Sequence, residues 1–125
     1  MMDLSRLLRP RSIAVLGSGW AANVVEQCQR MQFDGPVWPV HPTRSHIGGV
    51  PCFPTISDLP APPDATFVGV NRHATLDVVG DLAAMGAGGV ICFASGWREA
   101  GEGDLQDQLV RRAGAMPILG PNCYG

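Results

Sequence analysis

The sequence of 125 residues lacks the features that mark membrane, exported and nucleic-acid-binding proteins. No apolar run approaches the ~18–20 residues that cross a bilayer. The first residues, MMDLSRLLRPRS, also lack the continuous apolar segment of a signal peptide. The formal net charge is −2, and no cluster of basic residues forms a stripe. We therefore expect a cytoplasmic protein with neither a membrane nor nucleic acid among its partners.

Patterns that would indicate metal binding or catalysis are also missing. The four cysteines are widely spaced without a C-x-x-C pair, which favours reduced, mostly buried thiols. His41, His46 and Cys52 are close in sequence, but a zinc site would need a fourth ligand and tighter spacing. No Ser/His/Asp or Cys/His arrangement occurs at a recognisable spacing. The sequence therefore predicts no metal site and no catalytic residue in this chain.

What the chain does contain is the composition of a packed domain. Hydrophobic residues make up 46% of it and charged residues 16%, which is typical of a globular core and not of a disordered segment. A chain of this length is most simply a single domain. No repeat or internal boundary divides it, so we expect one domain over residues 1–125.

Short apolar runs alternate with amphipathic segments along this domain. The apolar runs predict five strands, within residues 13–16, 35–42, 65–70, 88–94 and 117–120. The amphipathic segments predict three helices, within residues 20–33, 72–86 and 101–116. Residues 43–64 are rich in Gly and Pro and predict a connecting loop with a short helical turn around Ser57 to Leu59. Prolines in the second strand favour a place near the sheet edge.

Two details of the helices are specific enough to test. In the first helix, the residues Ala21, Val24, Val25, Cys28 and Met31 share one apolar face. Gly86 is well placed to end the second helix. Strands alternating with helices form β-α-β units with right-handed crossovers. We therefore predict an α/β fold, a three-layer α/β/α Rossmann-like domain with a parallel sheet of about five strands.

A glycine turn after the first strand indicates where a ligand could bind. Gly17, Ser18 and Gly19 lead into the first helix in the pattern G-x-G-x-x-A, which lets a phosphate approach backbone N–H groups at a helix amino end. The second strand is followed by Arg44 and not by the acidic residue that grips the ribose of NAD. A cation there favours a ligand with a phosphate near its ribose, such as NADP or CoA. The alternatives are that the glycines merely form the turn and that Arg44 is a solvated surface residue.

Several stretches together resemble a known family. These are LLRPRSIAVLGS, GPVWPVHP, IGGVPCFPTISDLPAPPD, GAGGVICFASGWREAGEG and ILGPNCYG. They resemble the N-terminal CoA-binding domain of NDP-forming acyl-CoA synthetases, which are relatives of the succinyl-CoA synthetase α subunit. The resemblance covers nearly the whole chain, and its most specific pieces are GPNC and SGWREAGEG.

The resemblance implies a CoA-binding module of a ligase that makes a thioester with CoA, coupled to nucleotide phosphorylation. It places CoA at the carboxyl edge of the sheet, in contact with the glycine turn and with the residues that follow the second, third and fourth strands. The implied CoA contacts are Gly17, Ser18, Gly19, Arg44, Val70, Asn71, Arg72, Ala94, Ser95 and Gly96. In the family the chain continues beyond GPNC-x-G, and the phosphorylated histidine lies in that later part. We therefore expect a fragment of a longer chain that binds CoA and does not catalyse by itself, with further domains or subunits as partners.

One departure from the family keeps two alternatives open. The glycine loop is shorter than is usual in the family and carries the bulky Trp20, which predicts weaker CoA binding. The chain could then be a ligand-free interaction domain whose exposed apolar patch drives self-association into a homo-oligomer. It could also be the NADP-binding domain of an oxidoreductase, because Arg44 suits both ligands. The parent protein could be a synthetase or a regulatory acetyltransferase fusion.

Overall fold

The structure is a computed structural model that describes residues 3–17, 21–92 and 103–119. Its elements in chain order are α1 (Ser5–Leu8), β1 (Ile13–Leu16), α2 (Ala21–Arg30), β2 (Val37–Val40), β3 (His46–Ile47), β4 (Val50–Pro51), the 3-10 helix η1 (Ile56–Asp58), β5 (Ala65–Val68), α3 (Arg72–Met85), β6 (Val90–Cys92), α4 (Gly103–Ala113) and β7 (Ile118–Leu119).

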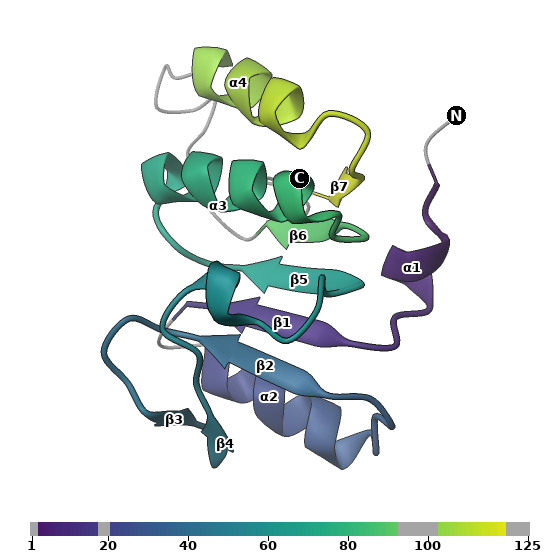
Figure 1. Ribbon diagram of the computed structural model, residues 1–125, viewed down its shortest axis with the longest axis vertical. Coiled ribbons are helices and arrows are strands. Elements are labelled where there is room, and N and C mark those ends of the chain that lie inside the picture. Colours follow the sequence, from purple (N-terminus) through teal and green to yellow (C-terminus); the bar gives the residue numbers. More distant parts are fainter. Residues whose placement is uncertain (1–2, 18–20, 93–102, 120–125) are drawn as a thin grey trace.

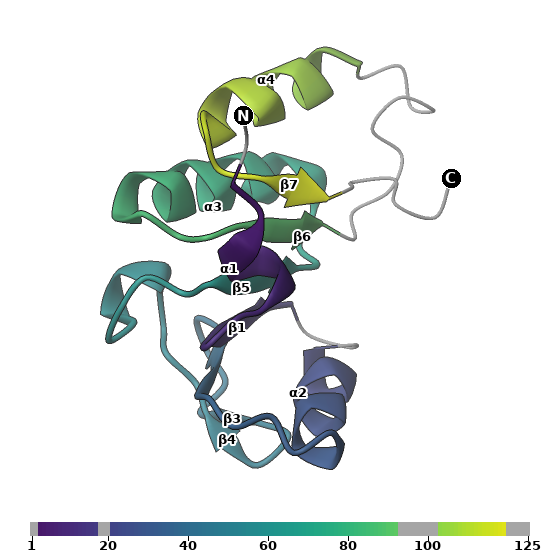
Figure 2. The ribbon, with the colours of Figure 1, turned by 90° about the vertical axis from the view of Figure 1, so that its right-hand side faces the viewer.

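Five of these strands form one sheet, in the order β2-β1-β5-β6-β7 (Figure 1). Every pairing in it is parallel. The helix α2 covers one face of the sheet near β1 and β2, whereas α3 and α4 cover the other face (Figure 2). The predicted three-layer α/β/α fold with a five-stranded parallel sheet is therefore confirmed. The proline-containing strand β2 lies at the sheet edge, as predicted.

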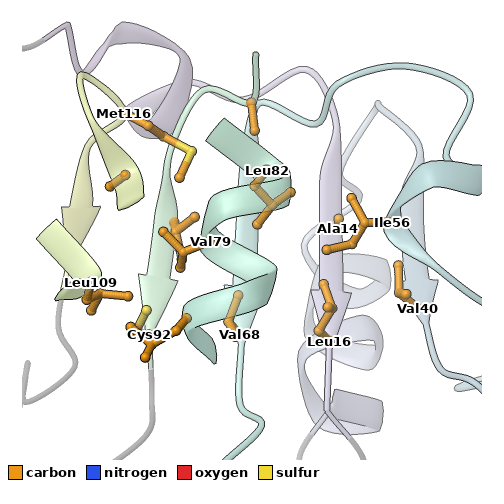
Figure 3. Packing of buried hydrophobic residues seen from close by; sticks show 14 of the residues in the cluster. Ala14, Leu16, Val40, Ile56, Val68, Val79, Leu82, Cys92, Leu109 and Met116 are labelled. Carbon is orange, nitrogen blue, oxygen red and sulfur yellow. The ribbon is translucent and has the colours of Figure 1, made fainter. Parts of the chain in front are cut away.

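The strand β1 shows why such a sheet forms from this sequence. All four of its residues are apolar and buried, as expected of a parallel strand covered on both faces. Ala14 and Leu16 face the core on the α3 side, and Ile13 and Val15 face the core beside α2. Figure 3 shows the larger of these cores, in which Val79 and Leu82 of α3 pack over the strands.

Capping residues set both ends of α3. The Asn71 Oδ1 accepts a hydrogen bond from the Ala74 N–H at 2.8 Å, which satisfies one of the free donors of the first turn. At the other end Gly86 has φ +84°, and its N–H is bonded to carbonyls of the last turn. Glycine adopts this left-handed conformation without steric cost. The prediction that Gly86 ends the helix is confirmed.

The prediction that Met31 lies on the buried face of the first helix is wrong. The helix α2 ends at Arg30, and Met31 is 78% exposed. Gln32 takes a left-handed φ of +55°, and the Phe33 N–H then bonds back to the Cys28 carbonyl at 3.0 Å. This closure turns the chain one residue after Met31, so Phe33 packs against the core in its place.

The connection between β2 and β5 is more ordered than the loop we predicted. It contains an antiparallel hairpin in which Ile47 of β3 faces Val50 of β4. Gly48 and Gly49 form its turn with φ values of +58° and +80°, which suits a two-residue hairpin loop. The predicted helical turn is present as η1, where the Thr55 hydroxyl and N–H both bond to the Asp58 carboxylate.

A charged cluster fixes the amino-terminal segment to the amino end of β5. The Arg6 Nε donates to the Asp64 Oδ1 at 2.6 Å, and the Arg11 N–H donates to its Oδ2 at 2.8 Å. Partial burial alone would raise the pKa of Asp64. The hydrogen bonds from Arg11 and Arg6 outweigh that effect, so the pKa of this carboxyl lies below its ordinary value.

Candidate functional site

A cleft of about 530 Å³ opens at the carboxyl ends of β1, β2 and β5. Its floor is apolar and includes Leu16 and Val40, which lie beside Ile56 in Figure 3. The walls come from the residues around η1 and from the first three turns of α3. The full lining is Leu16, Gly17, Val40, His41, Pro42, Pro54, Thr55, Ile56, Ser57, Gly69, Val70, Asn71, Ala74, Val78 and Asp81.

The strand order explains why the cleft lies there. From β1 the chain crosses through α2 to β2 on one side, and from β5 it crosses through α3 to β6 on the other side. The neighbours β1 and β5 therefore form the switch point of the sheet, where open α/β sheets bind their ligands.

Both strands at the switch point are followed by glycine. Gly17 has φ +149°, and a Cβ there would lie 3.4 Å from the Gly69 carbonyl oxygen. The Gly69 N–H donates to the Leu16 carbonyl at 2.8 Å, so the backbone pairing of β1 and β5 extends to Gly69. Glycine at both positions keeps the backbone accessible to a ligand.

Helix amino ends give this edge a positive electrostatic character. The amino ends of α2 and α3 both lie at the carboxyl edge of the sheet (Figure 1). The first-turn N–H groups of a helix and its macrodipole favour anions. At α3, Asn71 both caps the helix and lines the cleft. This end of the cleft is suited to phosphate groups.

His41 organises the turn that carries Arg44. Its Nδ1 accepts hydrogen bonds from the Thr43 N–H at 3.1 Å and the Arg44 N–H at 3.0 Å. Because Nδ1 acts as an acceptor, the neutral ring holds its proton on Nε2. The His41 N–H donates to the Phe53 carbonyl, which ties the turn to the segment before η1. A histidine at a strand end is thus a capping residue here.

The partly buried thiols are poor candidates for chemistry. Burial raises the pKa of Cys28. It also raises the pKa of Cys52, although the nearby Arg44 guanidinium acts in the opposite direction. A raised pKa leaves little thiolate at neutral pH, and the thiolate is the nucleophile.

Within the described residues, no group of three or more His, Cys, Asp or Glu side chains could hold a metal ion. No helix in that part of the chain is both long and apolar enough to cross a membrane.

The structure brings together part of the set predicted from the sequence. Gly17, Val70 and Asn71 line the same cleft. Arg44 is exposed on the turn after β2 and is not part of the lining. Arg72 is the first residue of α3. The other predicted residues, Ser18, Gly19, Ala94, Ser95 and Gly96, and also Trp20, lie outside the described residues.

Sequence reasoning missed the wall opposite the strands. Thr55 and Ser57 reach the cleft because the connection after β4 folds back over the sheet. The capping pattern formed by Thr55 and Asp58 was the available signal for this turn. Asp81 reaches the cleft because it shares a face of α3 with Ala74 and Val78, a spacing of four and three residues.

Comparison with known protein families identifies the family of this domain. The CoA-binding domain family matches residues 11–125. The chain belongs to this family. It is a CoA-binding domain homologous to part of the ADP-forming acyl-CoA synthetases, as its sequence resemblance implied. The NADP-binding and ligand-free alternatives find no support in these comparisons.

Relatives and solved structures agree on the kind of protein. The chain is 34% identical to trans-feruloyl-CoA synthase FCS1 of an unknown prokaryotic organism, over 98% of this chain and 19% of that protein. It is 28% identical to the ADP-forming acetate–CoA ligase II of Archaeoglobus fulgidus, over 98% of this chain and 20% of that protein. Dinucleotide-forming acetyl-coenzyme A synthetase 1 of Ca. Korarchaeum cryptofilum, solved with phosphate and ADP, matches with a TM-score of 0.90 and 34% identity, over 100% of this chain and 28% of that chain. This CoA-binding domain thus spans about a fifth of the length of these curated relatives.

Proposed function

We propose that this domain holds CoA in the cleft between β1, β2 and β5, as the CoA-binding module of an ADP-forming acyl-CoA synthetase. Two observations together support the proposal: the family of the domain and the position of its cleft. A CoA-binding domain has a cleft of about 530 Å³ at its switch point, where ligands of such sheets bind. Gly17, Val70 and Asn71, assigned to CoA from the sequence, line that cleft.

The charges around the cleft suit the separate parts of CoA. The pyrophosphate would lie against the backbone at Gly17 and the amino end of α3. Arg44 would pair with the 3′-phosphate, because a guanidinium binds phosphate through several N–H donors. The rest of the proposed contact set follows from sequence position: Ser18, Gly19, Arg72, Ala94, Ser95 and Gly96.

In this proposal the domain binds CoA, and other parts of the enzyme carry out the ligation. The relatives are much longer proteins with names of CoA ligases and synthases. The thiols of Cys28 and Cys52 have raised pKa values and do not suit a nucleophile. We infer that residues 1–125 form one module of a longer cytoplasmic enzyme. Its acyl chemistry, nucleotide and any self-association would depend on further domains or subunits.

Calorimetric titration of the 125-residue chain tests this proposal. We expect CoA to bind more tightly than dephospho-CoA, which lacks the 3′-phosphate, and more tightly than NADPH. Arg44→Ala should weaken CoA roughly fivefold, since the Arg44 pair is exposed to solvent. The same substitution should leave dephospho-CoA almost unchanged. Arg30→Ala is the matched control, because it removes an exposed arginine from the far end of α2.

The outcomes separate the parts of the proposal. Equal losses for CoA and dephospho-CoA in Arg44→Ala would contradict the placement of the 3′-phosphate. Binding of NADPH without CoA would contradict the choice of ligand. Failure of all three ligands to bind would refute CoA binding by this chain.

A further inference from the structure

The carboxylate of Asp81 is a wall group of the cleft to which no role has been assigned. Asp81 lines the cleft together with Ala74 and Val78 of α3. One turn earlier, Asp77 is engaged by the Arg112 guanidinium, whose Nη1 lies 2.9 Å from its Oδ1. Among the described residues, Asp81 has no such partner. Its two oxygens are therefore available as acceptors at the edge of an apolar cavity.

The two ends of the cleft differ in charge. At one end lie Gly17 and the capped amino end of α3, which favour phosphate. Asp81 follows Asn71 by ten residues (81 − 71), which at about 1.5 Å per residue is about 15 Å of helix axis. This span is comparable with the length of an extended nucleoside diphosphate. A carboxylate at the far end repels phosphate and accepts from an N–H donor.

The cleft that Asp81 lines also offers apolar surface that suits a flat aromatic group. Val78 precedes Asp81 by three residues on the same face of α3, and Ile56 and Ser57 of η1 line the same cleft. A heterocyclic base with an exocyclic amine could cover these apolar surfaces and donate to the carboxylate. Adenine has such an amine on the edge that would face Asp81. Hypoxanthine has a carbonyl oxygen at the same position, which would face the carboxylate acceptor to acceptor.

We propose that Asp81 accepts a hydrogen bond from the exocyclic amine of the CoA adenine. Asp81 thereby selects adenine over hypoxanthine and sets the direction of CoA in the cleft, with the base toward Asp81 and the pyrophosphate toward Gly17. This inference rests on the proposed function and adds a specificity-determining residue to it.

The test compares CoA with deamino-CoA, its hypoxanthine analogue, by calorimetry on the 125-residue chain. Both compounds carry the same phosphates, so their affinity ratio cancels the general effect of removing a negative charge from the protein. We expect the unsubstituted chain to bind CoA about 10-fold more tightly, the worth of one hydrogen bond to a charged group. In Asp81→Asn the ratio should fall to about one, because an amide can also donate to the hypoxanthine oxygen.

Asp77→Asn is the matched control, with the same change of charge on the same helix outside the cleft lining. Its affinity ratio should equal that of the unsubstituted chain. Two fragments locate the effect: 3′,5′-ADP should show the dependence on Asp81, and 4′-phosphopantetheine should not. An affinity ratio that Asp81→Asn leaves unchanged, or a dependence confined to 4′-phosphopantetheine, overturns this inference but not CoA binding. A chain that binds neither CoA nor deamino-CoA refutes the proposed function as well.

Discussion

Asn71 is the residue at which the stability of the domain and its ligand binding can be separated. It caps α3 through the bond from the Ala74 N–H to its Oδ1, and it lines the cleft where we place the pyrophosphate. Asn71→Asp keeps an oxygen at the capping position and adds a negative charge. The helix macrodipole favours that charge, whereas a bound phosphate opposes it.

The two effects have opposite signs and different sizes. Without ligand, Asn71→Asp should leave the free energy of unfolding unchanged or raise it by about 0.3–1 kcal/mol, the worth of an anion at a helix amino end. With ligand, a unit charge about 4 Å from a phosphate costs roughly 1 kcal/mol in water and about 4 kcal/mol near a protein surface. We therefore expect the affinity for CoA to fall about 10-fold or more.

Urea unfolding without ligand and calorimetry with CoA measure the two quantities. Asn71→Ser controls for the cap, since serine caps helices about as well as asparagine and adds no charge. Asn71→Ala should lose about 1 kcal/mol of stability with its cap. If Asn71→Asp is as stable as the unsubstituted chain and binds CoA equally well, then the phosphates do not lie at the amino end of α3.

Substitutions at four further residues test the stability of the domain and the role of the turn after β2. Gly80→Ala, in the middle of α3, would place its added Cβ 3.8 Å from the Arg112 Cδ, an ordinary contact distance. This substitution should stabilise the domain by about 0.5–1 kcal/mol. Gly86→Ala, at φ +84°, should destabilise it by about 1 kcal/mol, and urea unfolding that gave both changes the same sign would contradict this. Because the folded-state pKa of Asp64 is lowered, its contribution should be present above the unfolded-state pKa of about 4 and lost as pH falls through the folded value. The gap in unfolding free energy between the unsubstituted chain and Asp64→Asn should thus shrink from neutral pH to about pH 3, and a constant gap would count against it. Finally, His41→Ala should lower the affinity for CoA a few-fold, because the turn that carries Arg44 loses the acceptor of its N–H groups. His41→Asn should restore the affinity, because an Asn oxygen can accept the same N–H groups. Equal CoA affinities in the two variants would exclude this role of His41.

The sequence predicted a structural element correctly where the interactions that form the element are local. The apolar run of β1, the spacing of α3 and the glycine that ends it act over one or two turns of chain, so pattern and propensity predicted them. The same holds for the prolines that keep β2 at the sheet edge. The prediction for Met31 was wrong because the end of α2 depends on a left-handed conformation at Gln32. Asparagine or glycine at that position would have indicated this conformation, but glutamine does not.

The candidate site was predictable only in part, for a related reason. Gly17, Val70 and Asn71 follow strands, and the carboxyl ends of parallel strands meet at one edge whatever the loops do. Thr55 and Ser57 reach the same cleft through a connection that includes a hairpin. The path of this connection over the sheet depends on contacts with distant parts of the chain, so no single segment predicts it. The hairpin itself had a signal, a Gly-Gly pair between Ile47 and Val50.

The sequence by itself determined the five strands of the sheet, the order in which they alternate with α2, α3 and α4, and the glycine that ends α3. It also carried the resemblance to CoA-binding domains that the family match confirmed. Only the tertiary structure decided that β1 lies between β2 and β5, that η1 lines the cleft opposite the strands, and that Asp81 lines the same cleft as Gly17. Strand order and wall contacts arise from packing between residues far apart in the chain. Such packing is fixed by how apolar faces fit together in space, which periodicity along the chain does not encode.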